Sequence, residues 1–198
     1  MTHSKMRLIV ASNNSNKLRE FHEILGERFD IVSMHVAGIE ADIEENGTTF
    51  EVNALINANY VMKACHCAAI ADYSGLEVDA LGGAPGVYSA RYCGRHGDDD
   101  ANNALLLRNL EGIPAPRKAR YVAAIALVRS GHAPIVCRGT CEGEILTEGR
   151  GNGGFGYDPL FLCETGKTFA EISPEVKNAI SHRKRGIEAV LHALEAEQ

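Results

Sequence analysis

Four groups of residues in this sequence combine the side chains that bind phosphate, metal ions and aromatic ligands. They are "ASNNSNK" (Ala11–Lys17), the carboxylates Glu45 and Asp72, the glycine loop "GGFGYDP" (Gly153–Pro159), and the basic segment "PEVKNAISHRKR" (Pro174–Arg185). The first group ends at Lys17 and the last begins at Pro174, so the groups are spread over most of the chain. Only a fold that brings distant segments together could make them one site.

The segment "ASNNSNK" is typical of a turn between a strand and a helix. The first N–H groups of a helix have no partner within the helix, and the dipole there is positive, so this end can bind an anion. Lys17 adds a full positive charge. The glycines and the G-K-[ST] ending of a Walker A loop are missing. A capped helix with a solvated lysine explains the same residues.

The carboxylates Glu44, Glu45 and Asp72 suit a hard cation such as Mg²⁺. This ion takes oxygen ligands from one or two carboxylates and the remainder from water and substrate phosphates. Glu45 and Asp72 are candidate ligands if the fold brings them together, and solvated carboxylates are the ordinary alternative.

In "GGFGYDP", glycines allow close backbone approach to a ligand, and an exposed Phe155 would offer a stacking face to a base. A hairpin loop with its aromatic side chains turned into the core is the alternative. The last segment gathers Lys177, His182 and Arg183 on or beside a helix, where a solvated basic face would also account for them.

Composition excludes several classes of protein. The chain has 198 residues, is 45% hydrophobic and carries a formal charge of −6, which favours one globular domain (residues 1–198) and argues against nucleic-acid binding. No apolar run is long enough for a membrane span, and "MTHSKMRLIVAS" has no cleavage pattern of a signal peptide. We therefore expect a cytoplasmic protein without membrane contacts. The six cysteines are expected to be free thiols rather than a zinc site at Cys65, His66 and Cys67.

The hydrophobic pattern predicts an α/β or α+β fold with a mixed sheet. Strands are expected at residues 8–11, 30–36, 68–72, 76–78, 121–129, 135–146 and 160–162, and the strands at 121–129 and 135–146 should form a hairpin. Helices are expected from Lys17 to about Leu25, over 50–67, after Asp98, and from Ser173 onward. Thr48 and Glu51 form a possible capping box for the second helix. Tyr73 is expected in a loop, directly after a strand that ends at Asp72.

Together the segments resemble the non-canonical purine nucleoside triphosphate pyrophosphatases, the inosine and xanthosine triphosphate family. The resemblance runs nearly from end to end, in the family's order, through "ASNNSNKLREF", "ENGTTF", "AIADYSGLEVDALGGAPGVYSARYCG", "GNGGFGYDPLF" and "EVKNAISHR". Each motif is weak alone, and five in order make a specific match.

The resemblance implies an elongated mixed β-sheet with flanking helices, two lobes around a central nucleotide-binding cleft, and a homodimer. It implies Mg²⁺-dependent hydrolysis of ITP, dITP and XTP to the monophosphate and pyrophosphate. Asp72 and the residue at position 73 would be catalytic, and Glu45 and Asp72 would hold the metal. The substrate-binding residues that it implies are Ser12, Asn13, Asn14, Ser15, Asn16, Lys17, Ser74, Phe155, Gly156, Tyr157, Asp158, Lys177, Ser181, His182 and Arg183.

This chain departs from the family pattern at three positions, all at the phosphate and metal end. The family usually reads A-D-D-S-G, where this chain has Tyr73 in place of the second Asp. In the helix after "GTTF", Val52 replaces a carboxylate and Asn57 replaces a lysine. A phenol is a poorer base and a poorer Mg²⁺ ligand than a carboxylate.

Three functions are therefore open at this point. The first is a pyrophosphatase, with activity reduced by Tyr73, Val52 and Asn57. The second is a homologue that binds such nucleotides but turns them over slowly. The third is a phosphate-binding α/β domain that acts on another substrate, such as a pyrimidine triphosphate.

Overall fold

The computed structural model describes residues 5–197 of the chain. Residues 1–4, the start of the segment "MTHSKMRLIVAS" on which the absence of a signal-peptide pattern was judged, lie outside the described residues. The chain divides into two compact units. Unit 1 contains the described residues up to Tyr73, Ala124–Gly139, and the residues from Gly186 onward; unit 2 contains Ser74–Ala123 and Thr140–Arg185.

Within residues 5–197, six strands form one mixed sheet. They are β1 (Met6–Val10), β2 (Phe29–Ser33), β3 (Ala69–Val78), β4 (Lys118–Val128), β5 (Ile135–Ile145) and β6 (Phe161–Leu162), in the order β2-β1-β3-β4-β5-β6. β1 is parallel to both of its neighbours, β2 and β3, whereas β5 and β6 are antiparallel to each other. The structure thus confirms the predicted mixed sheet.

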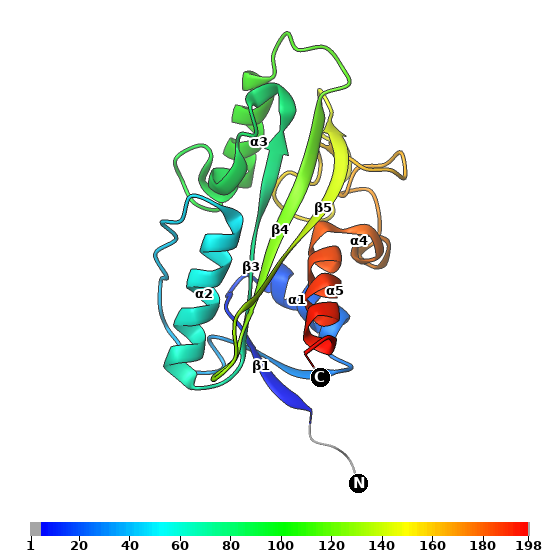
Figure 1. The fold of residues 1–198 in the computed structure, drawn as a ribbon. Helices are drawn as coiled ribbons and strands as arrows, with labels where there is room; N and C mark the ends of the chain where they lie inside the picture. Colours follow the sequence, from blue (N-terminus) through cyan, green and yellow to red (C-terminus); the bar gives the residue numbers. More distant parts are fainter. Residues whose placement is uncertain (1–4, 198) are drawn as a thin grey trace. The chain divides into compact units, whose positions relative to one another are not determined.

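In unit 1, parallel β1 and β2 are connected through α1 (Ser15–Leu25). Asn14 caps this helix, because its side chain accepts hydrogen bonds from the N–H groups of Asn16 and Lys17. α2 (Phe50–Cys65) and α5 (His182–Glu195) lie on opposite sides of the strands (Figure 1). The turn between β1 and α1, the loop before α2 and the first half of β3 carry the candidate residues of this unit.

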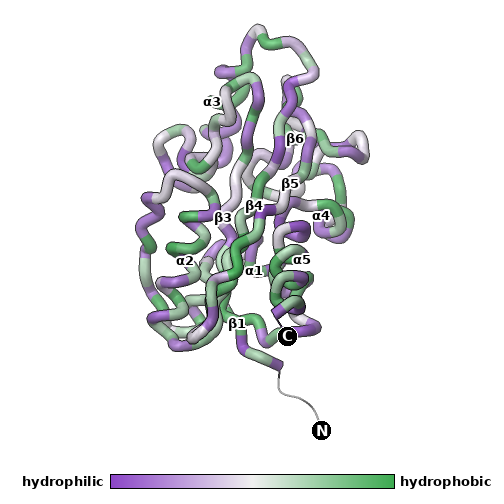
Figure 2. Tube along the Cα trace, in the orientation of Figure 1, coloured by the Kyte–Doolittle hydropathy of each residue, from purple (hydrophilic) through white to green (hydrophobic). Residues whose placement is uncertain are grey.

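Unit 2 has its own hydrophobic core, which includes Leu76, Leu106, Tyr121, Phe161 and Phe169. Around it lie two 3₁₀ helices (Asp79–Leu81 and Gly86–Arg91), α3 (Asp99–Asn109) and α4 (Pro174–Ile180). Figure 2 shows the apolar run of β4, of which residues up to Ala123 belong to this unit. Asp98 caps α3 and Ser173 caps α4, with Pro174 at the first helical position, so both helices begin where the sequence predicts.

Two local predictions are wrong. β3 is one strand of ten residues, so Tyr73 and Ser74 lie inside it rather than in a loop. Its residues are almost all buried, and burial on both faces keeps a strand together across polar residues that would otherwise mark a turn. The cap of α2 is Thr49, whose side chain accepts from the N–H of Val52, and not Thr48.

Two other observations bear on the predictions from composition. All six cysteines are free thiols, as expected. Among residues 5–197, no helix has the length and apolar character of a membrane span.

Candidate functional site

The candidate residues divide between the two units. Those of unit 1, called the phosphate end below, are Ser12 to Lys17, Glu45, Asp72 and Tyr73. Those of unit 2, called the base end, are Ser74, Phe155 to Asp158, Lys177, Ser181, His182 and Arg183.

At the phosphate end, Lys17 lies against Asp72. Its ammonium donates a hydrogen bond to the backbone carbonyl of Asp72 over 3.1 Å and lies 3.7 Å from the carboxylate Oδ2. Asp72 is only 3% exposed, whereas the Lys17 side chain is about one-fifth exposed. The helix is capped, by Asn14, as the alternative expected, but Lys17 is mostly buried against Asp72 and not simply solvated. The pair joins the first turn of α1 to the middle of β3.

The turn before α1 is ordered by its own side chains. The hydroxyl of Ser12 accepts from the N–H of Asn14, and Asn14 Oδ1 accepts from Asn16 and Lys17. These N–H groups are thus already occupied by the cap. An anion at this turn would depend on the ammonium of Lys17 and on side-chain donors more than on those N–H groups.

Glu45 is held by α2. The side-chain amide of Asn57 donates a hydrogen bond of 3.0 Å to Glu45 Oε1. Gly47 lies two residues after Glu45 in the same loop and is bound by the fully buried Asn53 of α2. The Asn53 side chain accepts from the N–H of Gly47 over 2.8 Å and donates to its carbonyl over 3.1 Å. Two asparagines one turn apart on α2 therefore fix the loop that carries Glu45.

Tyr73 has a packing role in this structure. Its side chain is 7% exposed, and its ring centroid lies 6.1 Å from that of Phe50, the first residue of α2. Arg138 covers the Phe50 ring and forms an ion pair with Glu51. Consecutive strand residues point to opposite faces of a sheet, which agrees with Asp72 meeting α1 while Tyr73 meets α2.

The contacts bring the two candidate metal ligands to different helices, Asp72 to α1 and Glu45 to α2. Within residues 5–197, no three His, Cys, Asp or Glu side chains gather as a metal site. One further oxygen is of interest. Asn57 Oδ1 is buried and has no hydrogen-bond partner in the described chain, although the amide nitrogen beside it bonds Glu45.

At the base end, Asp158 is the central residue. Its carboxylate is 2% exposed and accepts three hydrogen bonds. Tyr121 donates to Oδ1 over 2.9 Å, while Lys177 and the N–H of Phe155 donate to Oδ2 over 2.7 and 3.0 Å. A buried carboxylate remains charged only with such compensation, so Asp158 and Lys177 form a desolvated ion pair.

The glycine loop around Phe155 is fixed from two sides. Gly154 has a φ of +70°, and a Cβ there would collide with the Asp158 carboxylate, so glycine is required. Gly156 is held by α3: Asp99 accepts from its N–H over 2.7 Å, and Asn103 donates to its carbonyl over 2.9 Å.

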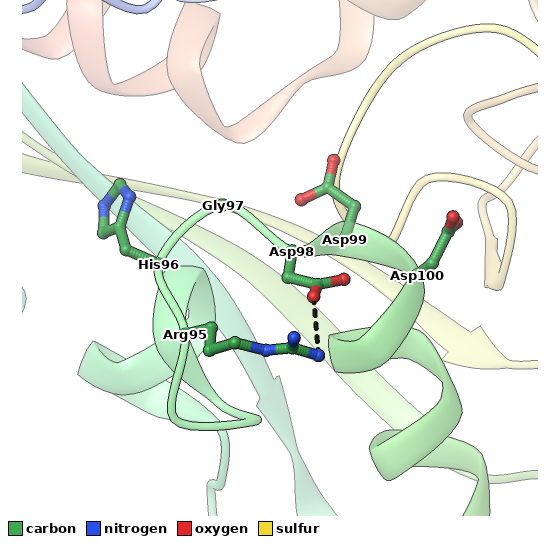
Figure 3. A pocket seen from close by; sticks show the side chains of 6 residues that line it. All are labelled: Arg95, His96, Gly97, Asp98, Asp99 and Asp100. Atoms are coloured by element: carbon green, nitrogen blue, oxygen red, sulfur yellow. Dashed lines mark ion pairs between the residues drawn. The ribbon is translucent and has the colours of Figure 1, made fainter.

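Asp99 also lines an open surface pocket of about 560 Å³ at the start of α3, formed by residues 95–100. Figure 3 shows Asp98 paired with Arg95, while the Asp99 side chain lies apart from that pair. The acidic side chains here therefore have structural partners, Asp98 as the cap of α3 and Asp99 on the glycine loop.

The basic residues of the base end also have close neighbours within unit 2. The Lys177 ammonium lies 4.5 Å from the centroid of the half-buried Phe155 ring, a cation–π contact. His182 stacks on Tyr121 with centroids 4.8 Å apart. The Arg183 guanidinium, 1% exposed, donates to the Ser74 hydroxyl over 3.1 Å. The alternative of a solvated basic face is wrong for these residues.

Ser181 and Tyr157 have structural partners. The hydroxyl of Ser181 accepts from the N–H of Lys184 in the first turn of α5. Tyr157 donates to the carbonyl of Ser89 over 2.7 Å, and burial raises the pKa of its phenol. Its ring belongs to the core of unit 2, so the expectation of an inward-turned aromatic holds for Tyr157, while Phe155 remains half-buried.

Sequence reasoning missed four residues that hold the candidate residues in place: Asn53, Asp99, Asn103 and Tyr121. A signal existed for Asn53, which shares the buried stripe of α2 with Phe50 and Asn57. An amide side chain on the buried face of a helix indicates a specific hydrogen-bond partner. Tyr121 gave no such signal, since an aromatic residue in a strand reads as core.

A family model described as Ham1 family matches residues 8–193. The chain belongs to the Ham1 family. Relatives named dITP/XTP pyrophosphatase are similar over nearly the whole chain. One from Clostridium perfringens is 47% identical over 92% of this chain and 94% of its own length. One from Bacillus subtilis is 45% identical over 95% and 96%.

A solved Ham1-family structure, the Ham1 protein of Staphylococcus aureus, has a TM-score of 0.86 with 39% identity. It covers 97% of this chain and 100% of its own. The family resemblance and the mixed α/β fold with flanking helices are thereby confirmed.

Proposed function

We propose that this protein hydrolyses the non-canonical purine nucleoside triphosphates ITP, dITP and XTP to the monophosphate and pyrophosphate, and so clears them from the nucleotide pool. The observation that carries the proposal is the Ham1-family match over residues 8–193, with relatives named dITP/XTP pyrophosphatase. The chemistry of the two groups of residues agrees with it.

At the phosphate end, Lys17 and the turn from Ser12 to Asn16 would bind phosphate oxygens. Glu45 and Asp72 would hold Mg²⁺, and when bound the ion would neutralise phosphate charge and orient the attacking water. The donor set fits this ion, because it consists of oxygens and includes the buried Asn57 Oδ1 that has no partner in the described chain. Asn57 would keep Glu45 in place through its amide nitrogen.

At the base end, Phe155 would stack on the purine, and Tyr157 and Asp158 would shape the sugar and base pocket. Lys177, Ser181, His182 and Arg183 would supply donors around the 6-keto group, with Ser74 held by Arg183. If adenine entered, its 6-amino group would face donors and leave them unpaired. Mismatches of this kind discriminate by as much as ~10⁴-fold.

We expect Tyr73 to change the rate of the reaction and not the kind of reaction that is catalysed. We propose that replacing a carboxylate with this phenol, together with Val52 and Asn57, lowers turnover. The relatives give no support to a homologue that only binds nucleotides, and the assay below includes that alternative as an outcome.

The test is to identify the products released from ITP, XTP, ATP and a pyrimidine triphosphate, with Mg²⁺ and with a chelator, by phosphorus NMR. We expect monophosphate and pyrophosphate in a 1:1 ratio from ITP and XTP, only with the metal. A matched measurement uses Tyr73→Asp, which should raise kcat. Binding of ITP without turnover by either protein would support the binding homologue, and preferred cleavage of the pyrimidine would overturn the purine assignment.

The homodimer and the cytoplasmic location stay predictions from the resemblance and from composition. Sedimentation of the purified protein tests the first, and fractionation of cells tests the second.

A further inference from the structure

We propose that Tyr121 is a positioning residue for purine binding: its hydroxyl fixes Asp158 and its ring supports His182. The inference rests on the proposed function, since these two partners belong to the base end. Tyr121 lies on β4, far in sequence from both.

The hydroxyl defines the orientation of the Asp158 carboxylate. Oδ2 is occupied by Lys177 and by the N–H of Phe155, and both of these donors come from segments outside the strands. Tyr121 holds the other oxygen, Oδ1, over 2.9 Å and does so from a strand. Hydrogen bonds to both oxygens leave the carboxylate little freedom to rotate, and the strand gives the Tyr121 donor a rigid support.

The ring of Tyr121 is itself fixed by aromatic neighbours. It is parallel to Phe169, at 6° and 5.5 Å, and tilted against Phe161 at 4.7 Å. It is also nearly parallel to the imidazole of His182, at 12° and 4.8 Å. A single side chain therefore contacts two candidate base-end residues that are 24 positions apart in the sequence, Asp158 and His182.

The Tyr121 hydroxyl keeps its proton at neutral pH. Burial, followed by the nearby Asp158 carboxylate, raises the pKa of Tyr121 well above its ordinary value of 10.0. Tyr157 and Asp99 shift the pKa in the same direction, and Lys177 and His182 are the other titratable groups around the pair. Tyr121 is therefore a donor to Asp158, and never a competing anion, at neutral pH.

The experiment compares the unmodified protein with Tyr121→Phe, which removes the hydroxyl and keeps the ring under His182. Asp158 and its neighbours would contact the base and sugar, which do not change during the reaction, so their loss should affect ground state and transition state equally. We expect an about tenfold rise in the KM for ITP and in the Kd for IMP measured by calorimetry, with kcat within about twofold.

Tyr92→Phe is the matched control. Its hydroxyl accepts a hydrogen bond of 2.8 Å from Asn109, and its ring packs on the same core, but it holds neither Asp158 nor His182. The control should change thermal stability slightly and leave both KM and Kd unaltered. Tyr121→Leu removes the ring as well and should raise the KM beyond that of Tyr121→Phe.

A lower Tm for Tyr121→Phe with unchanged KM and Kd would show a purely structural residue and overturn the inference alone. If the unmodified protein neither releases pyrophosphate from ITP nor binds IMP, the proposed function fails, and this inference with it.

Discussion

The phosphate end and the base end hold their acidic residues in different ways. Asp158 at the base end is almost fully buried and accepts from a tyrosine, a lysine and a backbone N–H. At the phosphate end, Asp72 is also buried and lies against the Lys17 ammonium, whereas Glu45 is half-buried and accepts a hydrogen bond from the side-chain amide of Asn57. A purine keeps its shape during the reaction, whereas the phosphates change charge and geometry. A base end built on one buried carboxylate with three donors, and a phosphate end that includes the half-buried Glu45, would suit these two tasks.

The two ends also share one structural feature, a loop glycine bound by helix side chains. In each, a loop glycine is bound through both its N–H and its carbonyl by side chains from the start of a helix. Asn53 of α2 binds Gly47, and Asp99 and Asn103 of α3 bind Gly156. Each helix therefore sets the position of a loop that carries a candidate functional residue, Glu45 in one case and Phe155 in the other.

The largest effect is expected from Asp158→Asn. The substitution leaves the buried Lys177 ammonium without its carboxylate, and breaking such a pair lowers the free energy of unfolding by about 3–5 kcal/mol. Urea unfolding measures it. The same change at Asp30, whose pair with Arg7 is exposed, should have an effect of about 0–1 kcal/mol. Equal effects at both positions would contradict the assignment of Asp158 and Lys177 to a desolvated ion pair.

Gly154→Ala should come next. The positive φ alone destabilises by about 1–3 kcal/mol, and the new Cβ displaces the Asp158 carboxylate, so the KM for ITP should also rise. Gly131→Ala is the control, because this turn glycine has a φ of +74° and open space around it. If both variants bind ITP equally well, the contact between Gly154 and Asp158 has no part in binding.

A third prediction concerns alkaline pH. Burial raises the pKa of Cys141, in unit 2, from its ordinary 9.0 to about 11. The folded state thus keeps a proton that the unfolded state loses first. This contribution is complete below pH 9 and is lost as the pH rises through about 11, with a slope of about 1 kcal/mol per pH unit. Urea unfolding at pH 8 and 10.5 measures the decrease, and Cys141→Ala should reduce it; an unchanged decrease would contradict the assignment.

The smallest effect on stability is expected at the phosphate end, from Asn57→Ala. The substitution removes the hydrogen bond to Glu45, which lowers the free energy of unfolding. It also removes a buried oxygen that has no partner in the described chain, which raises the free energy of unfolding, so the two effects oppose each other. We expect stability to change by less than about 1 kcal/mol, kcat to fall several-fold, and more Mg²⁺ to be required. A rise in the KM for ITP at saturating Mg²⁺ would instead assign Asn57 to substrate binding.

Features that depend on a few neighbouring residues could be predicted from the sequence. The caps of α3 and α4 at Asp98 and Ser173 are of this kind. Tyr73 shows the limit, because polar residues suggested a loop, whereas pairing and burial keep β3 continuous. The hydrogen bond between Asp99 and Gly156 joins residues 57 positions apart, and the one between Tyr121 and Asp158 joins residues 37 positions apart. Such contacts follow from topology, and no local pattern reveals them.

The most direct test of the account is the ratio of kcat/KM for ITP to that for ATP, measured as pyrophosphate release by the unmodified protein with Mg²⁺. Buried donors directed at a 6-keto oxygen predict a ratio of at least about 10². A ratio near one would contradict it, since the base end would then not distinguish a keto from an amino group.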